Sequence, residues 1–100
     1  MNEHLLRGTQ YLKFIRSQQY CCVCMQEKNI EPHHLKAIGM GNNRKNEMPE
    51  HFTAIPVCRE CHIEYHTKGQ KYQAEKWNLN HWKESTKYII KFIYEITKEK

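Results

Sequence analysis

Two C-x-x-C pairs constrain this chain more than any other feature of its sequence. Cys21 and Cys24 form the first pair, Cys58 and Cys61 form the second, and 33 residues lie between them. Each pair can present two thiolates to one tetrahedral zinc ion at about 2.3 Å. The separation exceeds the about 15–20 residues of a simple zinc ribbon, so the intervening segment must be a structured insertion. The sequence therefore predicts one structural zinc site with four cysteine ligands and no open position.

The fifth cysteine, Cys22, lies between the ligands of the first pair. It could replace Cys21 in principle, but Cys22-x-Cys24 is a less usual knuckle, so we interpret Cys22 as a small apolar residue. The alternative, that all five are ordinary buried cysteines, is disfavoured because core packing gives no reason to repeat the x-x spacing.

The length of the chain and its N-terminal sequence favour metal over disulfides. A single domain of 100 residues buries only about 60–65% of its unfolded surface and often needs an additional cross-link. The opening "MNEHLLRGTQ" has no apolar run long enough for a signal peptide or a membrane span, so we expect the reducing cytoplasm and no membrane partner. The net charge of +5 favours a polyanion such as nucleic acid, although solubility alone could also explain it.

Periodicity and turn residues indicate both helices and strands. Because Gly8 interrupts the first apolar pattern, we expect an N-terminal helix over about residues 9–17. The cysteine knuckle and a short strand should follow, and then a loop over 39–51 that is rich in Gly and Asn. A second strand is expected over 52–57, with Pro56 placing it at an edge or a strand end.

The second half of the sequence is predicted to be helical. A helix over 59–67 should end at Gly69, a short one should cover 70–76, and Asn80 should cap the last one. That last helix carries an apolar stripe that we expect to face the core, the alternative being a dimer or partner surface. The stripe consists of Trp82, Ile89, Ile93 and Ile96.

Four histidines flank the cysteine pairs. His62 and His66 are four residues apart on a predicted helix, so both rings lie on one face and suit a single metal ion. Zinc binding by the cysteines would bring this helix close to the strand that carries His33 and His34. Adjacent residues of a strand point to opposite faces, so one of this pair can bind the metal while its neighbour faces the substrate. The alternative is that some of them are surface histidines.

This arrangement suits phosphodiester hydrolysis. The reaction needs a cation on the scissile phosphate and a base that takes a proton from water, and imidazole can supply the base. The ordered motifs "CCVC", "PHHL", "GMG", "IPVCRECH" and "EYH" resemble those of the HNH, or ββα-metal, endonucleases, in particular the phage recombination-enhancement group.

The resemblance implies an α+β fold: a small zinc-stapled ββα-metal (HNH) core over about 20–69, with one N-terminal helix and C-terminal helices over about 70–97. It also implies a metal-dependent DNA endonuclease of low sequence specificity, which processes or recombines phage or prophage DNA in the bacterial cytoplasm. The expected partners are DNA and a recombination protein.

The resemblance also assigns roles to individual residues. His34 is similar to the general base, while His33, His62 and His66 are similar to ligands of a catalytic divalent ion, which could be Mg²⁺, Mn²⁺, Ni²⁺ or Zn²⁺. The rival interpretation is a non-catalytic zinc-binding module that binds nucleic acid, which would have no use for these four histidines together.

The sequence departs from the HNH pattern at the middle Asn. Thr53 stands where that Asn is expected, and Thr53 or His51 could brace the loop instead. Arg44 and Lys45 in the loop and Arg59 at the helix start are candidate DNA phosphate contacts, or else ordinary surface charge.

Overall fold

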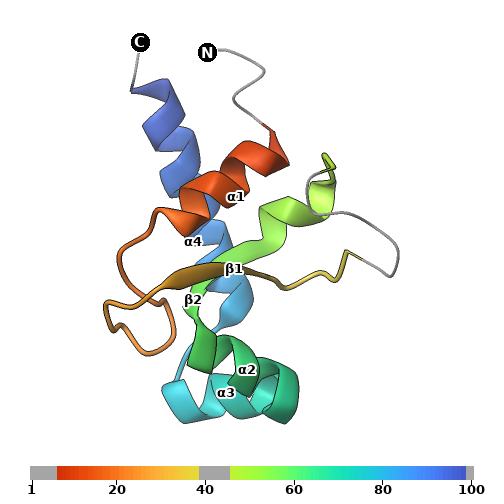
Figure 1. The fold of residues 1–100 in the computed structure, drawn as a ribbon, viewed down its shortest axis with the longest axis vertical. Helices are drawn as coiled ribbons and strands as arrows, with labels where there is room; N and C mark the ends of the chain where they lie inside the picture. The colour runs from red at the N-terminus through yellow and green to blue at the C-terminus, as the bar shows by residue number, and fades with distance from the viewer. Residues whose placement is uncertain (1–6, 39–45, 99–100) are drawn as a thin grey trace.

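The computed structural model describes residues 7–38 and 46–98. It is an α+β fold in which two short strands lie between helices (Figure 1). In chain order the elements are α1 (Gly8–Arg16), β1 (Ile30–His34), the 3-10 helix η2 (Pro49–Thr53), β2 (Ala54–Cys58), α2 (Arg59–Lys68), α3 (Gln70–Trp77) and α4 (His81–Thr97). None of the described helices is long and apolar enough to cross a membrane.

The two strands pair antiparallel, with Pro32 opposite Pro56 at the centre of the ladder. Neither proline has an N–H, so this must be a non-hydrogen-bonded pair, whose carbonyl groups point away from the partner strand. The carbonyl of Pro56 accordingly accepts the N–H of Cys22 at 2.9 Å. The outer edge of β2 thereby binds the cysteine knuckle, and Pro56 lies on an edge strand as the sequence predicts.

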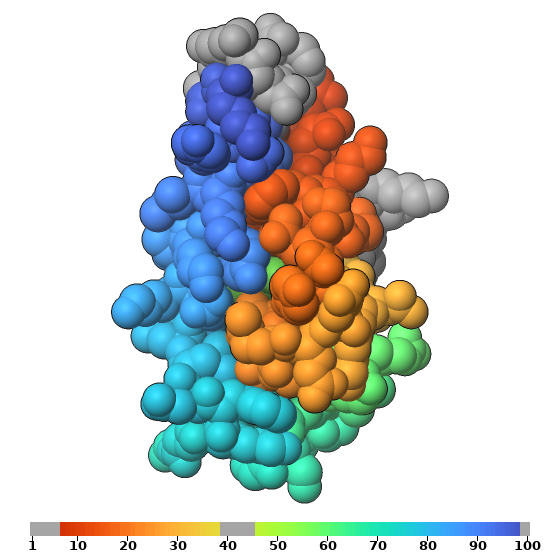
Figure 2. Space-filling model, turned by 90° about the vertical axis from the view of Figure 1, so that its left-hand side faces the viewer, coloured from red at the N-terminus to blue at the C-terminus, as the bar shows by residue number. Residues whose placement is uncertain are grey.

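The apolar core lies between the sheet and two helices, α1 and α4. Tyr11 of α1 is fully buried, donates its hydroxyl to the carbonyl of Ala54 at 2.8 Å, and packs edge-on against Phe92 of α4 at a centroid distance of 5.4 Å. Figure 2 shows α1 and the knuckle side by side with α4. Because α1 and β2 are fixed by the same packing, the knuckle between α1 and β1 is held against the sheet.

Helix α1 begins at Gly8 itself, which was expected to interrupt the apolar pattern. A side chain at this position would meet the Cβ of His51 at 2.7 Å and the carbonyl of Met48 at 2.9 Å, so only glycine fits. Glu47, which is distant in sequence, caps the helix, because its carboxylate accepts hydrogen bonds from the backbone N–H groups of Gly8 and Thr9. These contacts attach the segment before η2 to α1.

The predicted core stripe of α4 is partly wrong. Trp82 and Ile93 are 46% and 42% exposed, while Ile89 and Ile96 are partly buried. The buried face is instead His81, Ser85, Tyr88 and Phe92. His81, Tyr88 and Phe92 each lie one position before a residue of the predicted stripe, and His81 and Ser85 are polar. Counting apolar residues therefore shifted the stripe by about 100°. Asn80 caps α4 as predicted, through the N–H of Lys83.

The second strand also begins later than predicted. Phe52 and Thr53 belong to η2, and the strand covers Ala54–Cys58. The loop expected over 39–51 therefore ends in a 3-10 turn that starts at Pro49, where a proline is well tolerated at the first helical position. Gly69 ends α2 with a φ of 94°, in agreement with its predicted capping role.

Candidate metal centres

Four cysteines from two distant segments converge on one point. Cys21 and Cys24 lie in the turn after α1, Cys58 is the last residue of β2, and Cys61 lies in the first turn of α2. Any two of the four sulfur atoms lie within 4.8 Å of each other. The bridge between Tyr20 and Glu27 closes the first knuckle. The predicted four-cysteine cluster is therefore present.

The geometry of this cluster fits zinc. The sulfur atoms of Cys24 and Cys58 are 3.9 Å apart, and sulfurs bound tetrahedrally at about 2.3 Å are separated by about 3.8 Å. Burial alone would raise the pKa of Cys21, but backbone N–H groups, including those of Cys24 and Val23, lower it below its ordinary value. Donors aimed at this sulfur stabilise its thiolate, which is the form that binds metal, whereas burial raises the pKa of Cys58 and Cys61. The four cysteines can thus hold an ion such as zinc.

The remaining cysteine, Cys22, points into the core. It is buried, and desolvation raises the pKa of its thiol far above the usual range, with a further contribution from nearby Cys21. A thiol that stays protonated is inert and packs as a small apolar group. The interpretation of Cys22 as a core residue agrees with this position.

The second cluster consists of three histidines. His33 of β1 and His62 and His66 of α2 each offer a ring nitrogen within 4.8 Å of the others. The ring centroids are 4.7–5.1 Å apart. Three protein ligands leave one position of a tetrahedral ion open, as catalytic sites require. The structure therefore brings together the three predicted ligands.

His33 has the environment expected of a metal ligand. It is 2% exposed, and its Nε2 has no hydrogen-bond partner among the described residues. Leaving a buried polar atom unpaired costs about 1–3 kcal/mol, which an ion or a water molecule at this nitrogen would remove. Burial, and then the nearby rings of His62 and His66, lower the pKa of His33 to about 3. The ring thus stays neutral, which is the form that binds metal ions.

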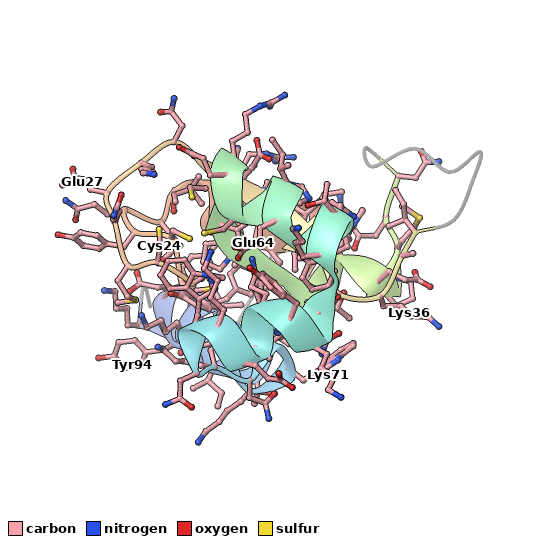
Figure 3. The ribbon with its side chains drawn as sticks, turned by 90° about the horizontal axis from the view of Figure 1, so that it is seen from below. Cys24, Glu27, Lys36, Glu64, Lys71 and Tyr94 are labelled. Carbon is pink, nitrogen blue, oxygen red and sulfur yellow. The ribbon has the colours of Figure 1, made fainter. Side chains whose placement is uncertain are left out.

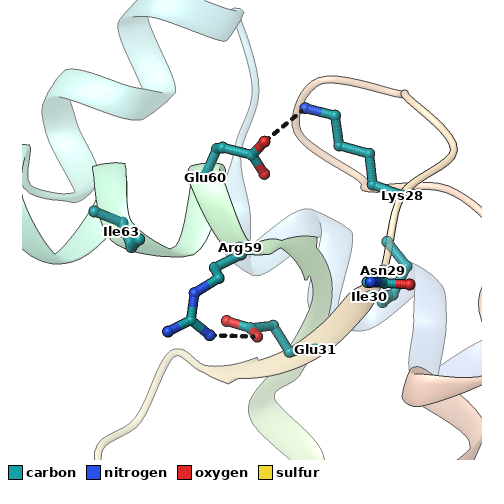
Figure 4. Close-up of a pocket in the computed structure, with 7 residues that line it drawn as sticks. All are labelled: Lys28, Asn29, Ile30, Glu31, Arg59, Glu60 and Ile63. Carbon is teal, nitrogen blue, oxygen red and sulfur yellow. Dashed lines mark hydrogen bonds and ion pairs between the residues drawn. The ribbon is translucent and has the colours of Figure 1, made fainter.

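Glu31 orients one of these ligands, a contact that the sequence interpretation missed. Its carboxylate accepts a hydrogen bond from Nδ1 of His62 at 2.6 Å, which leaves Nε2 to bind an ion. Its other oxygen lies 3.7 Å from the guanidinium of Arg59 (Figure 4). Glu31 precedes His33 by two residues, so strand alternation places both on one face and could have identified it.

His34, the neighbour of His33, bonds to a different partner. Its Nε2 is 2.9 Å from Nδ1 of His51, and Nε2 of His51 is 2.7 Å from the carbonyl of Asn46. A carbonyl can only accept, so neutral His51 carries its proton on Nε2 and accepts at Nδ1. His34 therefore donates from Nε2, and Nδ1 is the unprotonated nitrogen of its neutral ring.

Thr53 and His51 both brace the chain around His34. The hydroxyl of Thr53 accepts the N–H of Lys36 at 3.0 Å and donates to the carbonyl of Glu50 at 2.7 Å. His51 bonds to His34 directly, so η2 fixes both the ring and the backbone that follows it. Thr53 and His51, the two residues expected to brace this loop, thus both form hydrogen bonds to it, through different partners.

Of the three remaining predicted phosphate contacts, the structure describes Arg59. Arg59 is exposed and lines a shallow hollow of about 390 Å³ together with His62, His66 and Thr67. Arg44 and Lys45 lie outside the described residues, so their predicted phosphate contacts stay predictions.

Hydrogen bonds and ring contacts of buried polar side chains connect α2 to α3 and α4. Gln73 of α3 donates to the carbonyl of Cys61 at 2.8 Å and to Glu64 at 3.0 Å, and its side-chain oxygen accepts from His81 at 2.8 Å. The ring of Tyr65 lies 4.0 Å from that of His33 and 5.3 Å from that of His81. These contacts join both candidate metal clusters to α3 and α4, and no sequence motif indicated them.

Replacing one cluster cysteine should abolish folding, whereas replacing Cys22 should not. Structural zinc contributes about 10–16 kcal/mol, which is as large as the whole net stability of a typical domain, about 5–15 kcal/mol. We expect Cys58→Ala to lose zinc and cooperative thermal unfolding. The matched variant Cys22→Ala should keep one zinc and lose about 1 kcal/mol. A folded, zinc-free Cys58→Ala protein, measured by metal content and circular dichroism, would contradict the four-cysteine site.

Glu31→Gln should weaken metal binding at the histidine cluster. Loss of the carboxylate that orients a ligand typically costs about 10–100-fold in metal affinity. We expect calorimetric titration of Ni²⁺ into the zinc-loaded Glu31→Gln protein to show an affinity lower by about this factor. Glu60→Gln is the control, since Glu60 lies in the same region but pairs with Lys28 at 3.1 Å rather than with a histidine. Equal affinities of the two variants would show that Glu31 does not orient His62.

Comparisons with known proteins identify a family without a described activity. A family model described as "Protein of unknown function (DUF968)" matches residues 2–92. Neither a curated protein nor a solved structure matches the chain. Because the family model covers most of the sequence, the chain belongs to the DUF968 family.

Proposed function

We propose that this protein is a metal-dependent DNA endonuclease of the ββα-metal (HNH) type. The observation that carries the proposal is the division of His33 and His34 between two environments. His33 joins His62 and His66 in a three-nitrogen cluster, and His34 is held by His51 on a separate hydrogen-bond chain. A metal-binding group and an oriented imidazole on consecutive residues are what hydrolysis of a phosphodiester requires.

The residues of β1, α2 and η2 would share the chemistry. A divalent ion held by His33, His62 and His66 would stabilise charge on the scissile phosphate and the leaving oxygen. Nδ1 of His34 takes the proton from the attacking water, and the bond from Nε2 to His51 keeps the ring oriented. Glu31 fixes the ring of His62 through Nδ1, so that its Nε2 is left to bind the ion.

The surroundings of the cluster support a substrate that is contacted mainly through its backbone. Arg59 lines the hollow beside His62 and His66, where a phosphate next to the scissile one would lie. Arg44 and Lys45 are proposed to contact further phosphates. The hollow is shallow and open, which favours low sequence specificity. The net charge of +5 suits a polyanionic substrate.

The biological setting follows from the HNH resemblance. We place the enzyme in phage or prophage DNA processing or recombination, in the cytoplasm of a bacterial host and beside a recombination protein. The four-cysteine cluster, with zinc, supplies the fold rather than the chemistry, because four protein ligands leave no open position.

His34→Ala tests this function directly. We expect the variant to keep one structural zinc, a native circular dichroism spectrum and Ni²⁺ affinity, but to cleave plasmid DNA at least about 100-fold more slowly with Mg²⁺, Mn²⁺ or Ni²⁺. Lys36→Ala is the matched control, because Lys36 follows on the same segment and its side chain is exposed.

Two outcomes would contradict the proposal. Near-normal cleavage by His34→Ala would exclude His34 as the base. Absence of cleavage by the wild-type protein over single-stranded, duplex and branched DNA with all three metals would favour a non-catalytic zinc module that binds nucleic acid.

A further inference from the structure

Helix α3 presents aromatic rings to solvent instead of burying them. Within α3, all of whose residues the structure describes, Gln73 is the one buried side chain. Tyr72 is 45% exposed and Trp77 is 37% exposed. Exposed lysines surround these rings. We call this surface the α3 platform, and it consists of Lys68, Lys71, Tyr72, Lys76 and Trp77.

The two rings are connected through Lys76 and Glu64. The indole N–H of Trp77 donates to one oxygen of Glu64 at 2.8 Å, and the ammonium of Lys76 pairs with the other at 2.6 Å. The same ammonium lies 5.1 Å from the centroid of Trp77 and 5.9 Å from that of Tyr72. Rings that are fixed before binding lose little conformational entropy when a ligand stacks on them.

The platform is basic and adjoins the histidine cluster along the chain. The platform has three lysines, Lys68, Lys71 and Lys76, and the acids beside them are Glu75 of α3 and Glu64 of α2, which pairs with Lys76. The ammonium of Lys68 lies 5.9 Å from the centroid of Tyr72. Lys68 directly follows Thr67, which lines the hollow beside His66. Figure 3 looks onto this end of the molecule, with Glu64 on α2 in front and Lys71 at the outer margin.

We propose that the α3 platform binds an unpaired DNA strand that continues from the hollow beside His66. Bases stack on Tyr72 and Trp77, and the lysines contact the phosphates. Exposed aromatic rings favour an unpaired strand over a duplex, because in a duplex the base faces are already stacked on one another. This inference rests on the proposed function, since the strand is part of the same substrate.

The first test compares binding by matched variants. Zinc-loaded full-length protein, without added catalytic metal, is titrated against a labelled single-stranded oligonucleotide and the duplex of the same sequence, using fluorescence anisotropy. We expect tighter binding of the single strand and about tenfold weaker binding by Tyr72→Ala. The control is Tyr94→Ala on α4, an exposed tyrosine with Lys98 at 5.7 Å from its ring, which should bind like the wild type.

The second test reports on the position of the bases. The chain has two tryptophans, so Trp82→Phe leaves Trp77 as the one tryptophan of the sequence. Stacking of a base on Trp77 should quench its fluorescence in this variant. Lys68→Gln should also reduce the salt dependence of log affinity by about 0.7, the contribution of one phosphate contact to a single strand.

The outcomes separate this inference from the proposed function. Three results would each contradict strand binding by the α3 platform. They are equal effects of Tyr72→Ala and Tyr94→Ala on affinity, binding of the duplex as tight as that of the single strand, and binding without quenching of Trp77 fluorescence. Both tests measure binding alone. If the protein passes both tests and cleaves no DNA, strand binding by the α3 platform stands and the proposed nuclease activity is wrong. If it cleaves DNA and Tyr72→Ala has no effect on binding, the nuclease activity stands and strand binding by the platform is wrong.

Discussion

The convergence of four thiols is the constraint on which the rest of this structure depends. Cys21 and Cys24 belong to the knuckle after α1, while Cys58 and Cys61 mark the junction of β2 and α2. An ion held by all four fixes the start of α2 relative to the chain that leads into β1. Since β1 carries His33 and α2 carries His62 and His66, the same constraint sets the distances among the three histidines of the second cluster.

Strand alternation and two hydrogen bonds then give adjacent histidines different roles. His33 points toward α2, is buried, and stays neutral. His34 bonds to His51, which in turn bonds to the carbonyl of Asn46. Glu31 orients His62 from the strand, so His62 and His34 are each held by a residue outside the two candidate metal clusters. This separation of metal binding from proton transfer is the physical basis of the proposed nuclease.

Local signals predicted part of this arrangement. The x-x spacing identified the four-cysteine cluster, four-residue spacing paired His62 with His66, and Gly69 marked the end of α2. Tertiary contacts decided the rest. The buried stripe of α4 includes polar His81 and Ser85, and the cap of α1 comes from Glu47, 39 residues beyond Gly8. Neither could be derived from periodicity, because both depend on which segments meet in the folded chain.

The most direct test of the central claim is a cobalt titration of reduced, metal-free protein, followed by absorption and circular dichroism. The first equivalent of Co²⁺ should produce the full thiolate-to-cobalt charge-transfer absorption and complete the gain of helix, because the four-cysteine site forms the fold. The second equivalent should bind without further charge transfer, as expected for nitrogen ligands alone. Charge-transfer absorption that rises through two equivalents, or folding that requires the second ion, would contradict the account.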